Sequence, residues 1–171
     1  MTNFTFDGAH SSLEFQIKHL MVSKVKGSFD QFDVAVEGDI NDFSTLKATA
    51  TIIPSSINTK NEARDNHLKS GDFFGTDEFD KITFVTKSVS ESKVVGDLTI
   101  KGITNEETSD VEFNGVSKNP MDGSQVTGVI VTGTINRENY GINFNQALET
   151  GGVMLGKDVK FEASAEFSIS E

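Results

Sequence analysis

Apolar and polar residues alternate along most of the chain. The clearest run is the last one, in which every second residue is apolar: Val159, Phe161, Ala163, Ala165, Phe167 and Ile169. A period of two is typical of strands that bury one face. Similar runs, separated by turn residues, lie within residues 4–6, 13–17, 34–40, 46–52, 82–84, 98–100, 111–113 and 129–135. Eight or nine such strands predict an all-β fold, either an antiparallel barrel or a sandwich.

A short segment between these strands has a different pattern. Thr59 and Glu62 have the T-x-x-E spacing of a capping box, in which two side chains satisfy free backbone N–H groups at a helix start. Apolar residues then follow at helical spacing, and Gly71 is a suitable end. We therefore predict a short helical insertion near residues 60–70. No linker, repeat or biased tract divides the chain, so residues 1–171 are predicted to form a single domain.

The aromatic residues are almost all of one kind. The chain has 14 Phe, one Tyr and no Trp, and Phe suits a dry interior because its ring has no polar group. Small residues share the predicted inward face of the strands: Ala48, Ala50, Gly133, Ala163 and Ala165. Either they leave the middle of the barrel hollow, or they make room for neighbouring Phe rings. The pattern alone leaves both interpretations open.

Charge and cysteine content narrow the range of partners and compartments. The formal net charge of −11 argues against nucleic acid as a partner, because phosphates repel an acidic surface. No run approaches the ~18 apolar residues of a membrane span, so no integral membrane segment is expected. The first residues lack the features of a signal peptide, and the chain has no Cys. Both observations favour a cytoplasmic protein.

Candidate chemical groups are densest in the predicted helix. Arg64 and His67 are three residues apart and so near one helical face, where they could bind an anion while Asp65 fixes the tautomer of His67. The alternative is structural, with Arg64 and Asp65 tying the helix to the barrel rim. The remaining histidines are His10 and His19, and no metal-ligand spacing is recognisable among the three. We expect no metal and no cofactor.

Several short motifs agree in order and spacing with one known family over essentially the whole chain. They comprise His10-Ser11, His19-Leu20 and the segments 64–74, 82–84, 96–104, 135–142 and 148–152. Each is weak alone, but together they resemble the YceI-like family of lipocalin-like proteins. The chain differs at Phe4, where members commonly have Trp, and at Gly8-Ala9, where a Pro is frequent. Members are often exported, whereas this sequence favours the cytoplasm.

The resemblance implies an extended eight-stranded antiparallel lipocalin-like barrel, partly capped by a helix. It also implies a tunnel for a polyisoprenoid or similar lipid, in which apolar contacts supply the affinity and polar groups orient the ligand. Candidates for the apolar lining are Phe15, Ile17, Phe29, Phe32, Phe73, Phe74, Phe84, Ile100 and Phe144. Candidates for the polar head group are Arg64, His67, Arg137 and Asn143.

We therefore expect the protein to bind a long-chain isoprenoid or related amphiphilic lipid as a carrier or storage protein, and not to be an enzyme. The sequence has no G-x-S-x-G elbow for a nucleophilic serine. Two alternatives stay open. One is a scaffold barrel with a filled core, and the other is an enzyme that uses His67 and Asp65 on a bound lipid. The sequence also leaves open whether the protein forms a homodimer.

Overall fold

The computed structural model describes residues 2–20, 22–145 and 154–170, whose strands form one antiparallel sheet. Ten strands in this part of the chain follow the order β3-β4-β6-β7-β8-β9-β10-β1-β2-β5. Their bounds are β1 (Asn3–His19), β2 (Ser23–Phe29), β3 (Phe32–Asp39), β4 (Asp42–Ile52), β5 (Ile57–Asn58), β6 (Ile82–Val89), β7 (Lys93–Ile100), β8 (Ile103–Lys118), β9 (Gln125–Asn136) and β10 (Asp158–Ser170).

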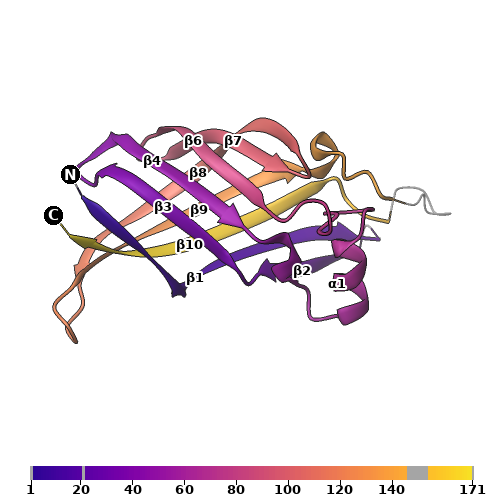
Figure 1. The fold of residues 1–171 in the computed structure, drawn as a ribbon, viewed down its shortest axis with the longest axis horizontal. Coiled ribbons are helices and arrows are strands. Elements are labelled where there is room, and N and C mark those ends of the chain that lie inside the picture. The colour runs from indigo at the N-terminus through magenta and orange to yellow at the C-terminus, as the bar shows by residue number, and fades with distance from the viewer. Residues whose placement is uncertain (1, 21, 146–153, 171) are drawn as a thin grey trace.

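The sheet curls so strongly that its edge strand β3 returns to the first part of β1 (Figure 1). The backbone N–H of Thr2 donates to the carbonyl of Gly38 at 3.1 Å. Nearby, the rings of Phe6 and Phe32 meet edge to face, with centroids 5.3 Å apart. The predicted all-β, lipocalin-like fold is confirmed.

The number of strands in the described residues differs from the predicted eight. The apolar runs at 4–6 and 13–17 belong to a single strand, β1. Two further strands are not marked by an alternating run in the sequence. β2 has only a short apolar pattern, interrupted by Gly27, and β5 has two residues, which is too few to show a period.

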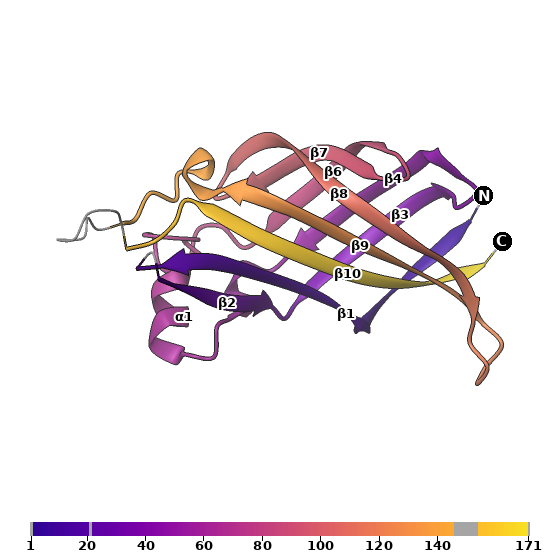
Figure 2. The ribbon, with the colours of Figure 1, turned by 180° about the vertical axis from the view of Figure 1, so that it is seen from behind.

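A bulge interrupts the pairing of β1 with β10. Asp7 pairs with Glu166 of β10, but the next pair is Ser12 with Ser164, so β1 carries extra residues at this point. Ser11 closes the bulge, because its hydroxyl donates to the Asp7 carbonyl at 2.6 Å and accepts from the Glu166 N–H at 3.0 Å. Bulges bend the strand that carries them, and the bend in β1 is visible from behind (Figure 2). The part of β1 after the bend pairs with β2.

The predicted helix is confirmed as α1 (Glu62–Lys69), which lies beside one end of the curled sheet (Figure 1). The expected capping box was wrong. Asn61 is the N-cap, and its side chain accepts from the Arg64 N–H at 3.0 Å. Asn is a strong N-cap residue and stands directly before the first helical position. Thr59 is thereby free to bond Asp65 instead, at 2.5 Å between the two side-chain oxygens.

Two short 3-10 helices, η1 (Pro54–Ser56) and η2 (Arg137–Tyr140), complete the described structure. η2 follows β9 directly and carries two buried side chains, Arg137 and Tyr140. No described helix is long and apolar enough to cross a membrane. The sequence motif at 148–152 lies outside the described residues.

Candidate functional site

The curled sheet encloses a mostly apolar cavity of about 470 Å³. This volume is within the range of roughly 300–1,000 Å³ typical of ligand pockets. The predicted apolar candidates all line it: Phe15, Ile17, Phe29, Phe32, Phe73, Phe74, Phe84, Ile100 and Phe144. Strand alternation places those in β1, β2, β3, β6 and β7 on the inner face, whereas Phe73, Phe74 and Phe144 lie outside the strands. Their contact with a ligand stays a prediction.

The small inward residues have two different roles. Ala48, Ala50, Ala163 and Ala165 line the cavity, so their short side chains leave space there. Gly133 makes room for a neighbouring ring, because a Cβ atom at this position would lie 2.9 Å from the ring of Phe161. The two interpretations that the sequence left open therefore apply to different positions.

Aromatic rings gather where α1 and the segment after it cover the cavity. The rings of Phe73 and Phe144 are 5.2 Å apart. The ring of His67 meets both edge to face, at 5.0 Å from Phe73 and 4.8 Å from Phe144. His67 lines the cavity together with the two phenylalanines. Its imidazole is thus the polar member of an aromatic wall.

The predicted pairing of His67 with Asp65 was wrong. His67 Nε2 lies 2.9 Å from Asp72 Oδ2, a carboxylate beyond the end of the helix. Asp65 accepts from the backbone N–H and the hydroxyl of Thr59, at 2.9 and 2.5 Å. Positions two apart on a helix do not face each other, and Asp65 therefore turns toward β5 while His67 turns toward the cavity. The catalytic pair considered from the sequence is not formed.

Arg64 takes part in the structural network around Thr59. Its Nε donates to Thr59 Oγ1 at 2.8 Å, and its Nη2 donates to the Thr59 carbonyl at 2.6 Å. Thr59 is 3% exposed, so these bonds satisfy buried oxygens next to β5. Arg64 ties the helix to the rim as the structural alternative proposed, and it also lines the cavity. A role with a head group stays a prediction.

Arg137 is the most buried charged side chain of the site, at 5% exposure. Its guanidinium donates to three carbonyl oxygens, those of Gly156 at 2.8 Å, Ile142 at 2.8 Å and Phe144 at 2.9 Å. It forms no ion pair with a carboxylate among the described residues. Burial lowers the pKa of Arg137, while the nearby charge of Glu138 opposes this shift. Arg137 lines the cavity, so it brings a positive charge to the wall.

Asn143 differs from the other head-group candidates. It is exposed and does not line the cavity, whereas its neighbours Ile142 and Phe144 do. In this segment the side chains on either side of Asn143 point inward and its own points away. The structure therefore separates Asn143 from Arg64, His67 and Arg137.

Sequence analysis missed several polar residues of the cavity wall, among them Glu107 and Ser109 on β8. Glu107 accepts a 2.5 Å hydrogen bond from the hydroxyl of Tyr140, which has no exposed surface. Burial, followed by the hydrogen bond and the charge of Glu107, raises the pKa of Tyr140 well above its ordinary value. The sequence could have revealed them. Val111 and Phe113 face inward, and alternate residues of a strand share one face, so Ser109 and Glu107 are expected to face inward as well.

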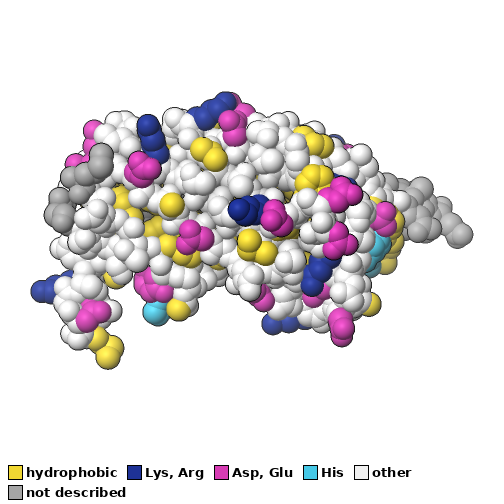
Figure 3. Space-filling view, in the orientation of Figure 1, with side chains coloured by type: hydrophobic (Ala, Val, Ile, Leu, Met, Phe, Trp, Pro, Cys, Tyr) yellow, Lys and Arg dark blue, Asp and Glu magenta, His cyan; other side chains and the backbone are white. Residues whose placement is uncertain are grey.

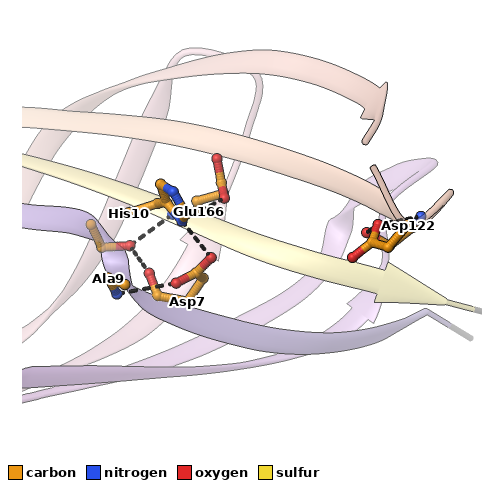
Figure 4. A network of polar contacts seen from close by, with 7 residues as sticks. Asp7, Ala9, His10, Asp122 and Glu166 are labelled. Atoms are coloured by element: carbon orange, nitrogen blue, oxygen red, sulfur yellow. Dashed lines mark hydrogen bonds and ion pairs between the residues drawn. The ribbon is translucent and has the colours of Figure 1, made fainter. Parts of the chain in front are cut away.

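A separate polar cluster lies on the surface at the β1 bulge (Figure 4). His10 Nδ1 lies 2.8 Å from Asp7 Oδ2 and 3.6 Å from Glu166 Oε2. The hydrogen bond between His10 and Asp7 raises the pKa of His10 and lowers that of Asp7. Among the described residues these are the three whose ligand-type atoms converge within 4.8 Å, as a metal site would require. The sequence could not bring Glu166 to His10, because the bulge that joins them follows no regular pattern.

The outer surface contrasts with the cavity wall. On the face seen in Figure 3, Asp and Glu side chains are scattered among Lys and Arg, and they do not gather into one patch. The acidic side chains on this face are therefore dispersed. Most of the phenylalanine side chains, by contrast, line the cavity on the inside of the sheet.

Fold and site together define a lipocalin-like protein, an antiparallel sheet curled around an apolar cavity. A family model described as a YceI-like domain matches residues 4–167, and the chain belongs to this family. A UPF0312 protein of Staphylococcus aureus strain MSSA476 is 99% identical over 171 residues, the whole of both chains.

Two solved structures extend the comparison. The YceI protein of Campylobacter jejuni is 32% identical, covers 100% of both chains and has a TM-score of 0.76. A domain of Saccharophagus degradans, described as polyisoprenoid-binding, is 14% identical, covers 99% of this chain and 100% of its own, and has a TM-score of 0.71. At 14% identity the likeness establishes a shared fold alone.

Proposed function

We propose that the protein binds a long-chain isoprenoid or related amphiphilic lipid in its interior and acts as a carrier or storage protein. The observation that carries the proposal is the cavity of about 470 Å³, with phenylalanine, valine, leucine, isoleucine and alanine over most of its wall. Membership of the YceI-like family and the printed description of the Saccharophagus degradans domain support the same ligand class.

Apolar contacts alone are sufficient for such binding. Transfer of a five-carbon isoprene unit from water is worth roughly 3–4 kcal/mol, at about 0.8 kcal/mol per buried carbon group. A few units therefore reach micromolar affinity after the costs of ordering the chain are subtracted. Polar groups are then left to orient the ligand, and Arg137 is the strongest candidate because it is the most buried charged side chain of the cavity wall.

The test is mass spectrometry of lipid extracted from purified variants. Phe84 lines the cavity and Val85, the next residue, is 48% exposed on the outside. Phe84→Asp should abolish lipid co-purification, because a charge in the apolar wall is costly, while Val85→Asp should leave it unchanged. Ala50→Phe is a second variant, which narrows the cavity and keeps it apolar.

Circular dichroism confirms that each variant is folded before its lipid is compared. Lipid content equal to wild type in folded Phe84→Asp and Ala50→Phe would overturn the proposal. A wild-type protein that purifies empty and binds no fluorescent fatty acid probe would overturn it as well. That second result would favour the scaffold barrel considered from the sequence.

A further inference from the structure

Glu107 and Ser109 form a polar site in an otherwise apolar region of the cavity wall. They are two residues apart on β8, so their side chains share one face of the sheet, and both line the cavity. The lining residues nearest to them on the flanking strands are apolar: Val94 and Leu98 on β7, and Val131 and Ile135 on β9. Polar groups in such surroundings cost free energy unless they are hydrogen-bonded.

Ser109 has an unused hydroxyl. The residue is 5% exposed, and its Oγ has no hydrogen-bond partner among the described residues. In this part of the chain every sealed side-chain oxygen has a partner, so the Ser109 oxygen is open to the cavity. A serine hydroxyl can both donate and accept. It is therefore placed to bond something that enters the cavity.

Glu107 offers an acceptor beside it. Its Oε2 accepts from the Tyr140 hydroxyl at 2.5 Å, and it forms no ion pair with a described cation. Tyr140 is fully buried and belongs to η2, so this bond fixes the carboxyl group from outside the cavity. The remaining capacity of an ionised carboxylate is to accept further hydrogen bonds.

The chemistry of this pair selects a hydrogen-bond donor. An anionic group would place a second negative charge beside Glu107, and a pure hydrocarbon would leave Glu107 and Ser109 unpaired. A hydroxyl group can donate to Glu107 and accept from Ser109 at once. We propose that Glu107 and Ser109 bind the hydroxyl group of a long-chain alcohol or other hydroxylated lipid. This inference rests on the proposed function, because it requires a lipid in the cavity.

The experiment compares two probes, geranylgeraniol and its methyl ether, by displacement of a fluorescent fatty acid. The ether keeps the apolar chain and the oxygen but lacks the donor. Wild type should bind the alcohol about tenfold more tightly, as a hydrogen bond to a charged group predicts. Glu107→Gln should reduce this preference, because an amide can donate to the ether oxygen. Ser109→Ala should weaken the binding of both probes to a similar extent, because both have an oxygen that accepts from the Ser109 hydroxyl.

Matched controls come from the outward neighbours on the same strand. Glu106 and Thr108 are exposed, and Glu106→Gln and Thr108→Ala should keep both the wild-type affinities and the full preference for the alcohol. Ser109→Ala removes an unpartnered oxygen, so it decides the test if Glu107→Gln fails to fold. Equal affinity of wild type for the two probes, or unchanged affinity for both probes in Ser109→Ala, would overturn this inference alone. Failure of folded wild type to bind either probe would overturn the proposed function itself.

Discussion

Tyr140, the single tyrosine of the chain, donates its hydroxyl to the carboxylate of Glu107 at 2.5 Å from a position without solvent exposure. The bond joins η2 to β8 and positions a charged group at the cavity wall. The same hydrogen bond therefore both stabilises the contact between η2 and β8 and holds the Glu107 carboxylate at the cavity. Because the chain has no Trp, the ultraviolet signal of this one residue is also unusually easy to follow.

The first prediction concerns ionisation of Tyr140. Burial, the hydrogen bond to Glu107 and the charge of Glu107 raise its pKa well above the ordinary value of 10.0. Since the folded-state pKa is the higher one, this contribution to stability is complete below about pH 10 and is lost as the pH rises further. In an alkaline titration, tyrosinate absorbance should therefore appear together with loss of the circular dichroism signal. Tyrosinate that forms near pH 10 in a folded protein would contradict the assignment.

The second prediction concerns Arg137. A lysine ammonium cannot reproduce a guanidinium fork that reaches three carbonyl oxygens. Arg137→Lys should therefore lower the free energy of unfolding by about 2 kcal/mol or more, because buried carbonyls lose their donors. Urea denaturation measures this change. Lys160→Gln is the control, since Lys160 is exposed on β10, and it should alter stability by less than about 0.5 kcal/mol.

The parts of the fold that were predictable follow from unbroken alternation. In β10 the inward residues from Val159 to Phe167 all line the cavity, because each side chain follows from its neighbour by a period of two. The same reasoning predicted that Phe15 in β1 and Phe84 in β6 face the cavity, which they do. In β8 the inward-facing positions include Glu107 and Ser109. Because these residues are polar, a search for alternating apolar residues does not find them.

The parts that were not predictable depend on local chemistry or on distant contacts. Asn61 and Thr59 both suit a helix N-cap, and only the observed hydrogen bonds decide between them. His67 has Asp65 and Asp72 within five residues, and the direction of the chain after α1 selects Asp72. The meeting of Asp7 with Glu166 depends on a bulge that interrupts the regular register.

The third prediction uses the pH dependence of that surface cluster. The hydrogen bond to Asp7, with the charges of Asp7 and Glu166, raises the pKa of His10 above its ordinary value of 6.5. Its contribution to stability is thus complete below about pH 6.5 and is lost as the pH rises through the raised pKa. Asp7 has a lowered pKa, so its contribution is present above about pH 3.8 and is lost in stronger acid.

NMR titration of the imidazole protons measures the pKa of His10 directly. Asp7→Asn should shift it downward, because the carboxylate supplies the largest cause of the rise. Glu166→Gln should produce a smaller downward shift, since the Glu166 charge is a weaker cause. A His10 pKa that does not move in Asp7→Asn would show that the pair does not form in solution.

The last prediction tests how closely the interior packs beside the polar site. A Cβ atom on Gly133 would lie 2.8 Å from Ser109 Oγ and 2.9 Å from the Phe161 ring, whereas one on Gly128 would meet nothing closer than 3.8 Å. Both glycines lie in β9, and neither has a positive φ. Gly133→Ala should therefore destabilise the protein by about 1–3 kcal/mol through overpacking. Gly128→Ala should be neutral or slightly stabilising, because alanine loses less backbone entropy on folding. Urea denaturation measures the free energy of unfolding of both variants. Equal values would show that the Phe161 ring can move aside without cost, which would contradict close packing here.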